Sequence, residues 1–272
     1  MPQVLISKSL FHLVYEMAAI RVLLTFDDGP HAAEDPDNST AKALSTLSTK
    51  NCIAVFFVQT HAENGGAKIR MNNPQGAKWS KNAFIAKHLI QVHTGSKKDH
   101  EYHTVRAKAK PDNLKDGNTY ANGLESDLVR AKKAIMDLVG RQPKFVRATY
   151  LERNKMVNET YAAATVDLKH IGAHVVSGDA DPWTIAEQKI KRPARYLHRR
   201  DVVKRQLHER MKKAVEGGAT DLIVLFHELH PVTVRYLAEF IDHIKSFTMA
   251  GHTFTLVDDS AIALQILENT NI

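Results

Sequence analysis

Seven short runs of apolar and β-branched residues recur along this sequence, separated by longer stretches that include helical periodicity. Most of the runs are almost continuously apolar, as expected of strands in a parallel sheet that is covered on both faces. Strands that alternate with helices predict a parallel α/β fold, either open or closed into a barrel. The predicted strands are Val22–Phe26, Ile53–Val58, Leu89–His93, Lys144–Ala148, Ile171–Val176, Leu222–Phe226 and Thr253–Val257.

The regions between the predicted strands are of two kinds. The clearest predicted helix is Glu125–Val139, with acidic residues at its start and Gly140 just past its end. Two other segments, Thr60–Asn82 and Thr94–Gly123, follow strands but show little periodicity. Because α/β barrels build their active sites from loops at the C-terminal ends of strands, we expect both segments to be long functional loops.

Length and composition fit one folded unit. The chain has 272 residues, 43% of them hydrophobic and 25% charged, which is ordinary for a globular protein. We see no internal repeat and no interdomain linker, so residues 1–20 are interpreted as a lead-in and residues 21–272 as a single domain. The lone Cys52 excludes an internal disulfide framework and a multi-cysteine zinc module. A metal site in this chain must therefore use histidines and carboxylates.

The start of the chain carries no clear targeting signal. His12 and Glu16 interrupt the apolar segment Leu10–Ile20, which lacks the continuous apolar stretch of a secretory signal. No run approaches the roughly 18 apolar residues that a membrane span needs, so no membrane partner is expected. The sequence predicts a cytoplasmic protein, or a secreted one whose N-terminus has been trimmed.

Positive charge is concentrated in one segment. The net charge is +7, whereas Lys189–Lys213 holds eleven Lys or Arg residues against two Asp or Glu, a local charge of +9. An anionic polymer, nucleic acid or membrane surface would be attracted to such a run. A solvated helix face is the favoured explanation, because Val203, Leu207 and Met211 recur at four-residue spacing after Asp201, the expected helix start. Aromatic residues are sparse there, so no nucleic-acid partner is predicted.

Two adjacent carboxylates end the first predicted strand. Residues 25–31 read Thr-Phe-Asp-Asp-Gly-Pro-His, and the Gly-Pro turn lets the chain bring both Asp27 and Asp28 to the rim of the sheet. Two like charges this close repel each other, so one is expected to need a cation and the other an Arg partner.

Other predicted strands also end in residues that carry chemistry. The C-terminal ends of neighbouring parallel strands meet at one edge of the sheet, where such residues can form one site. Five strand ends of this type in one chain make coincidence improbable. Besides the aspartate pair, the residues are His93 after the third strand, with His100 and His103 in the same loop, Arg147 after the fourth, Asp179 and Asp181 after the fifth, and His227 after the sixth.

These motifs resemble those of polysaccharide deacetylases of the NodB-homology type, carbohydrate esterase family 4. Residues 25–30 match the first motif of that family residue for residue, and Leu225-Phe226-His227 matches its last motif. The resemblance covers roughly residues 21–258. It implies a distorted (β/α) barrel of about seven parallel strands and the metal-dependent hydrolysis of N-acetyl or O-acetyl groups. The implied partner is an acetylated carbohydrate.

The resemblance also implies a role for each matching catalytic residue. Asp27 would be the general base and Arg147 would orient it. His227 would protonate the leaving amine or alcohol, and Asp179 would orient His227. Tyr150 stands where the third motif often has an aromatic residue, and its backbone amide would help to hold the oxyanion.

The metal ligands implied by the resemblance are Asp28 and His93. Four residues after His93, where the family has a second histidine, this sequence has Lys97, and a charged ammonium cannot ligate a metal. Either His100 or His103 is then the third ligand, or the affinity for metal is reduced. Zn²⁺ suits a mixed imidazole and carboxylate set, and Co²⁺ or Ni²⁺ would also fit.

Two further motif positions depart from the family, and two tryptophans are candidates for sugar contacts. Thr149 replaces a proline common in the third motif, and the Asp-x-x-Asp-Trp motif is reshaped into Asp179-Ala180-Asp181-Pro182-Trp183. Trp183 and Trp79 lie in expected rim loops, where an aromatic face would stack on a sugar ring, although packing roles are equally open.

Two other functions compete with a carbohydrate deacetylase. One keeps the fold and changes the substrate, giving an amidohydrolase that acts on a small non-sugar amide; the missing export signal favours it slightly. The other, suggested by Lys97, is a catalytically weak module that uses the cleft to bind glycan. Metal content and acetate release distinguish the three.

Overall fold

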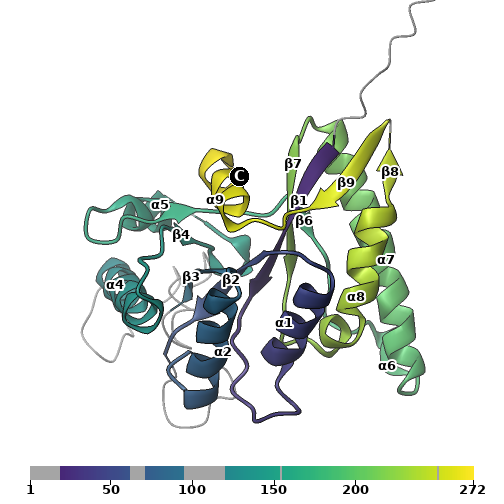
Figure 1. Cartoon of the computed structure of the whole chain (residues 1–272), viewed down its shortest axis with the longest axis horizontal. Helices are drawn as coiled ribbons and strands as arrows, with labels where there is room; N and C mark the ends of the chain where they lie inside the picture. The colour runs from purple at the N-terminus through teal and green to yellow at the C-terminus, as the bar shows by residue number, and fades with distance from the viewer. Residues whose placement is uncertain (1–18, 62–70, 95–119, 154, 250) are drawn as a thin grey trace, which may run out of the picture.

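The computed structural model describes residues 19–61, 71–94, 120–153, 155–249 and 251–272, and His100, His103 and Lys97 lie outside these ranges. In the described residues one sheet is flanked by helices (Figure 1). Its strands are β1 Ala19–Asp27, β2 Ala54–Gln59, β3 Leu89–Thr94, β4 Phe145–Val146, β5 Lys169–His170, β6 Val175–Val176, β7 Asp221–Phe226, β8 Thr248–Met249 and β9 His252–Leu256. The helices are α1 Ser39–Thr49, α2 Pro74–Ile85, α4 Tyr120–Val139, α5 Lys155–Ala162, α6 Ile185–Gln188, α7 Ala194–Glu216, α8 Pro231–Ser246 and α9 Ser260–Asn269.

The sheet is almost entirely parallel. Its strands follow the order β5-β4-β3-β2-β1-β7-β6, and β9 pairs in parallel with the start of β1. Only the two-residue β8 is antiparallel, against β9. The parallel α/β fold predicted from the alternation of strands and helices is confirmed. Because the carboxyl ends of β1, β3, β4 and β7 meet at one edge, the motif residues at these ends are brought together.

One predicted strand, Ile171–Val176, is wrong. The chain forms β5 just before this segment, paired with β4, and forms β6 at its end, paired with β7. The residues between cross from one end of the strand order to the other. The backbone of Gly172 hydrogen-bonds outside the sheet. Its N–H donates to Ile272 O at 3.1 Å, and its carbonyl accepts from Arg147.

Two predicted helix and loop boundaries also change. The segment Thr60–Asn82 was expected to be a loop, but its second half belongs to α2, where Asn73 caps the N-terminus and Pro74 occupies the first turn. Helix α7 starts seven residues before Asp201. The stripe Val203, Leu207 and Met211 on α7 is buried, as its spacing predicted.

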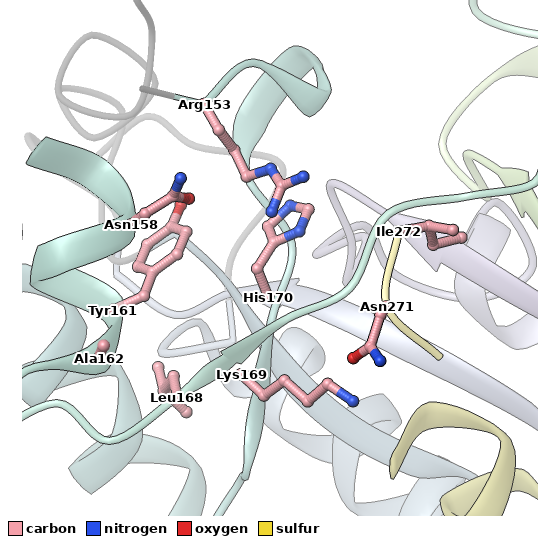
Figure 2. Close-up of a pocket in the computed structure, with 9 residues that line it drawn as sticks. All are labelled: Arg153, Asn158, Tyr161, Ala162, Leu168, Lys169, His170, Asn271 and Ile272. Carbon is pink, nitrogen blue, oxygen red and sulfur yellow. The ribbon is translucent and has the colours of Figure 1, made fainter. Parts of the chain in front are cut away.

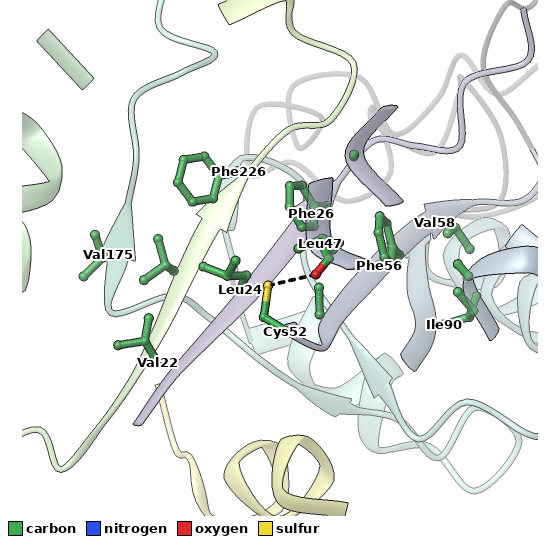
Figure 3. Close-up of a cluster of buried hydrophobic side chains, with 14 of the residues drawn as sticks. Val22, Leu24, Phe26, Leu47, Cys52, Phe56, Val58, Ile90, Val175 and Phe226 are labelled. Carbon is green, nitrogen blue, oxygen red and sulfur yellow. Dashed lines mark hydrogen bonds between the residues drawn. The ribbon is translucent and has the colours of Figure 1, made fainter. Parts of the chain in front are cut away.

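Apolar side chains fill both faces of the sheet. On one face the rings of Phe26 and Phe56 stack with centroids 5.1 Å apart, and Phe226 stacks on Phe26 at 6.1 Å (Figure 3). Cys52 belongs to the same cluster, and its thiol approaches the carbonyl of Leu47. The opposite face packs against α9 through a smaller cluster. No helix in the described part of the chain combines the length and apolar character needed to cross a membrane. The packed sheet therefore gives the strand ends a rigid base.

Candidate active site

A buried ion pair joins the ends of β1 and β4. Asp27, which ends β1, is 3% exposed, and its Oδ1 accepts a hydrogen bond from Nη1 of the fully buried Arg147 at 3.0 Å. The same nitrogen donates to Thr25 Oγ1 at 2.7 Å. Because a buried carboxylate is costly unless it is paired and hydrogen-bonded, Arg147 fixes both the charge and the position of Asp27.

The second aspartate of the pair faces His93. Asp28 Oδ1 lies 3.2 Å from His93 Nε2 and accepts from Gln59 Nε2 at 2.9 Å. The backbone φ of Asp28 is 73°, a left-handed conformation that turns this carboxylate away from the direction of β1. The bend therefore separates the tasks of two neighbouring carboxylates, one facing Arg147 and the other facing His93.

The donor set around His93 fits a cation. His93 Nδ1 lies 2.9 Å from the carbonyl oxygen of Arg147, which can only accept, so Nδ1 carries a proton. In the neutral ring the lone pair of Nε2 then points at a carboxylate oxygen, which is favourable only with positive charge between the two atoms. Burial lowers the pKa of His93, but Asp27 and Asp28 outweigh it and raise that pKa. An oriented imidazole beside a carboxylate is a common arrangement for zinc ligands.

The structure supplies two of the predicted metal ligands and leaves the third open. Asp28 and His93 come together as predicted. Within the described ranges, no three His, Cys, Asp or Glu side chains are close enough to hold a metal. The candidates for the third ligand, His100 and His103, and the departure at Lys97 fall outside the described residues.

A second buried pair joins the residue after β7 to the segment after β6. His227 Nδ1 is 3.0 Å from Asp179 Oδ1, and the backbone N–H of His227 donates to Asp179 Oδ2 at 2.7 Å. Thr233 and Ser177 also donate to this carboxylate. Burial opposes a positive charge on His227, but Asp179 outweighs it and raises the pKa of the imidazole to about 9. His227 is therefore protonated at neutral pH.

Asp27 of the first pair and both residues of the second pair line one pocket. Its volume is about 570 Å³, and its other lining residues are Asp28, His93, Tyr150, Leu151, Val176, residues 178 and 180–182, Leu225 and His230. The side chain of Tyr150 is 72% exposed and its φ is 55°, so a non-glycine residue holds a strained backbone at the rim. A carboxylate paired with Arg and an imidazolium paired with Asp in one pocket provide a base and an acid.

The two tryptophans are placed elsewhere. Trp79 lies on α2 and packs against the core, with Lys78 Nζ 4.7 Å from the centre of its ring. Trp183 packs edge-on against Tyr196 at 5.7 Å, and the Arg199 guanidinium lies 4.8 Å from its ring. Neither tryptophan is among the residues that line the pocket. The proposed stacking of Trp79 and Trp183 on sugar is therefore not supported, and their packing role is favoured.

A different cavity, of about 390 Å³, lies between α5, β5 and the end of the described chain (Figure 2). Arg153 and His170 lie side by side in it. Burial and the nearby Arg153 lower the pKa of His170 to about 3, so this imidazole stays neutral. None of the nine lining side chains is a carboxylic acid. This cavity lacks the base and acid of the larger pocket.

Comparison with known proteins identifies the family of this chain. The family model described as polysaccharide deacetylase matches residues 15–168, more than half of the chain. The chain belongs to the polysaccharide deacetylase family. The matched region of this family includes Asp27, Asp28, His93 and Arg147, and it ends before Asp179 and His227.

Relatives within the polysaccharide deacetylase family are distant. Peptidoglycan-N-acetylglucosamine deacetylase PgdA of Listeria monocytogenes is 26% identical over 244 residues, which cover 88% of this chain and 38% of that protein. The chain thus spans well under half the length of this relative. Among solved structures, the chitin deacetylase of the fungal pathogen Colletotrichum lindemuthianum is 17% identical, with a TM-score of 0.58 and 90% of each chain covered. A family 4 acetyl xylan esterase from Clostridium thermocellum, solved with a cobalt ion, is 24% identical, with a TM-score of 0.55 and coverage of 92% and 93%. These neighbours confirm the NodB-type fold.

Several side chains that support the site were not predicted. Thr25 holds Arg147, Gln59 holds Asp28, and Ser177 and Thr233 hold Asp179. Thr25 precedes Asp27 by two residues, so strand alternation puts both on one face, a signal that the sequence did contain. Gln59 and Thr233 carry no comparable signal.

Glu228 is a further unpredicted contact between the two halves of the site. It follows His227, is 1% exposed, and lies beneath the turn that follows Asp28, where an ideal Cβ on Gly29 would be 1.5 Å from its Oε1. Burial raises the pKa of Glu228 to about 8, so its carboxyl is largely neutral at pH 7. A side chain at position 29 would therefore collide with Glu228, which is enclosed and cannot move aside freely.

We expect Gly29→Ala to destabilise the protein by about 1–3 kcal/mol, the usual cost of overpacking. Glu228→Ala in the same background should recover part of that loss, because it removes the atoms that the new methyl group meets. Urea unfolding of the two single variants, the double variant and the wild type gives the coupling energy. Strictly additive effects would contradict this close approach.

Proposed function

We propose that the chain is a metal-dependent hydrolase that removes N- or O-linked acetyl groups from a carbohydrate. Two oppositely arranged charge pairs, Asp27–Arg147 and Asp179–His227, carry the proposal, because Asp27, Asp179 and His227 line one pocket. A hydrolysis of this kind needs a base for the attacking water and an acid for the leaving group. The pocket offers one of each.

Asp27 is the proposed base. Its carboxylate accepts the proton of the water that attacks the acetyl carbonyl, and Arg147 keeps the carboxylate in place through the bond between Nη1 and Oδ1. Asp28 and His93 would hold a divalent cation such as Zn²⁺, Co²⁺ or Ni²⁺, which when bound lowers the pKa of water and polarises the carbonyl. The backbone N–H of Tyr150 is the proposed donor to the oxyanion at the rim.

His227 is the proposed acid. With a pKa of about 9 it holds a proton at neutral pH that it can pass to the leaving nitrogen or oxygen. Asp179 fixes the ring through Nδ1, which leaves Nε2 as the nitrogen that delivers the proton. An amide nitrogen is a poor leaving group, so a ready proton matters most for N-acetyl substrates.

The substrate class is inferred from the relatives. The PgdA relative acts on N-acetylglucosamine of peptidoglycan, and the structural neighbours include a chitin deacetylase and an acetyl xylan esterase. All three names describe acetylated polysaccharides, which supports a glycan over a small non-sugar amide.

We expect acetate release from acetylated glycans, and loss of that release when a chelator is present. The panel should contain chitin oligomers, acetylated xylan and small amides such as acetanilide. Restoration of turnover by added Zn²⁺, Co²⁺ or Ni²⁺ identifies metal loss as the cause. Turnover of the small amides alone would favour the amidohydrolase, and glycan binding without turnover would favour the binding module.

Asp27→Asn should lower kcat by about 10²- to 10⁴-fold, because the amide cannot accept a proton from water. The variant keeps Asp28 and His93, so its metal content should match that of the wild type. Acetate release and metal analysis of the same samples test both points. Wild-type turnover in Asp27→Asn would exclude Asp27 as the base.

Asp179→Asn should move the alkaline limb of the kcat/KM profile to lower pH. The negative charge of Asp179 raises the pKa of His227, so its removal lets His227 lose the proton earlier as the pH rises. Measuring kcat/KM from pH 5 to 10 for both proteins tests this assignment. An unchanged alkaline limb would show that His227 is not the acid that limits turnover.

A further inference from the structure

A second cavity adjoins the active-site pocket along the side of the sheet. It has a volume of about 580 Å³ and lies between β6 and α7, and it shares Val176 and Asp181 with the active-site pocket. In the hydrogen-bonded order of the sheet β6 is a terminal strand, so no further strand of that order covers its outer side. The two cavities therefore adjoin at Val176 and Asp181, and we call the second cavity the side path.

Arg210 and Lys213 of α7 line this path, whereas Gln206 is not among its lining residues. Gln206, Arg210 and Lys213 lie at helical spacing on one side of α7. Gln206 contacts the active-site loop, since its Nε2 donates to Asp181 Oδ2 at 3.3 Å. From Gln206 to Lys213 the helix rises about 10 Å at 1.5 Å per residue. Lys213 therefore marks the end of the path that is remote from the active-site loop.

The remote end is rich in hydrogen-bond donors. Arg210 donates one N–H to the carbonyl of Val176, which anchors the guanidinium beside β6 and leaves its other N–H groups for a ligand. Lys213 is exposed and lines the cavity. His174 Nδ1 accepts from the N–H of Ile223 at 3.1 Å, so in the neutral ring Nε2 carries the proton and is a further donor.

Several other cations of the same helix are matched by carboxylates. Arg200 and Lys204 contact Glu239, and Lys212 contacts Glu216. The cavity contains a single carboxylate, Asp181, at the end nearest to the active site. An anion would therefore be repelled from the shared end and attracted to the end formed by Arg210 and Lys213.

We propose that this path is a binding subsite for a carboxylate on a sugar unit next to the one that loses its acetyl group. The planar guanidinium of Arg210 suits two-point binding of a carboxylate, and Lys213 adds a second charge. The inference rests on the proposed function, because it assumes that the glycan occupies the adjoining pocket. It adds a preference for acidic over neutral acetylated glycans.

Binding to the inactive variant Asp27→Asn tests the subsite without requiring turnover. Calorimetry should compare a hyaluronan tetrasaccharide, in which every second unit carries a carboxylate, with a neutral chitin tetramer. In this background, Arg210→Gln with Lys213→Ala should lower the ratio of hyaluronan to chitin affinity by about ten-fold or more, the range expected for hydrogen bonds to a charged group. Lys213→Glu alone should lower that ratio as well, and thermal unfolding checks that each variant is folded.

Lys212→Ala is the matched control, because it removes the same charge from the neighbouring position of α7. It should leave the affinity ratio unchanged. An equal fall for Lys212→Ala would overturn the subsite and indicate general attraction to a basic helix. No preference of the Asp27→Asn background for hyaluronan over chitin would also overturn it. Failure of the active enzyme to release acetate from any glycan would instead reject the proposed function, since the binding ratio is measured separately.

Discussion

The buried guanidinium of Arg147 is the interaction on which the site depends. It donates to Asp27 and Thr25 on β1 and to the carbonyls of Ile171 and Gly172 after β5, and it lies 4.2 Å from the ring of Phe57. A fully buried positive charge is tolerated only with such complete pairing. The same residue orients His93 through its backbone carbonyl. One residue thus links the proposed base, the proposed metal ligand and the crossing between β5 and β6.

The pair of Asp179 and His227 is also buried and charged, but here the carboxylate is the partner that holds the proposed catalytic residue. At the first pair a buried cation keeps a carboxylate in place, and at the second a buried carboxylate keeps an imidazole protonated. The proposed base and the proposed acid are thus each held by a buried partner of opposite charge. Glu228, directly after His227, packs on Gly29, which follows Asp28.

The strand ends were predictable because parallel strands bring their carboxyl ends to one edge, and Asp27, His93 and His227 each end a strongly apolar run. The separation of β5 from β6 was not predictable. Apolar character indicates that a segment is buried, but it does not indicate which strand the segment pairs with. Trp79 and Trp183 were candidates for sugar contacts or for packing because they lie in expected rim loops, and both pack against the core, which no local pattern could decide. Gln59 and Thr233 act through distant partners that no local pattern reveals.

The side path lies beside β6, the strand that ends the hydrogen-bonded order of the sheet. A terminal strand exposes backbone groups along its outer side, and proteins cover such groups with side chains or helices. At β6 the cover is α7, and Arg210 satisfies the carbonyl of Val176. Asp179 follows β6 by three residues, so the strand that carries this opening also leads to the residue that orients His227. The terminal position of β6 in the sheet therefore places the proposed subsite next to the loop that carries Asp179.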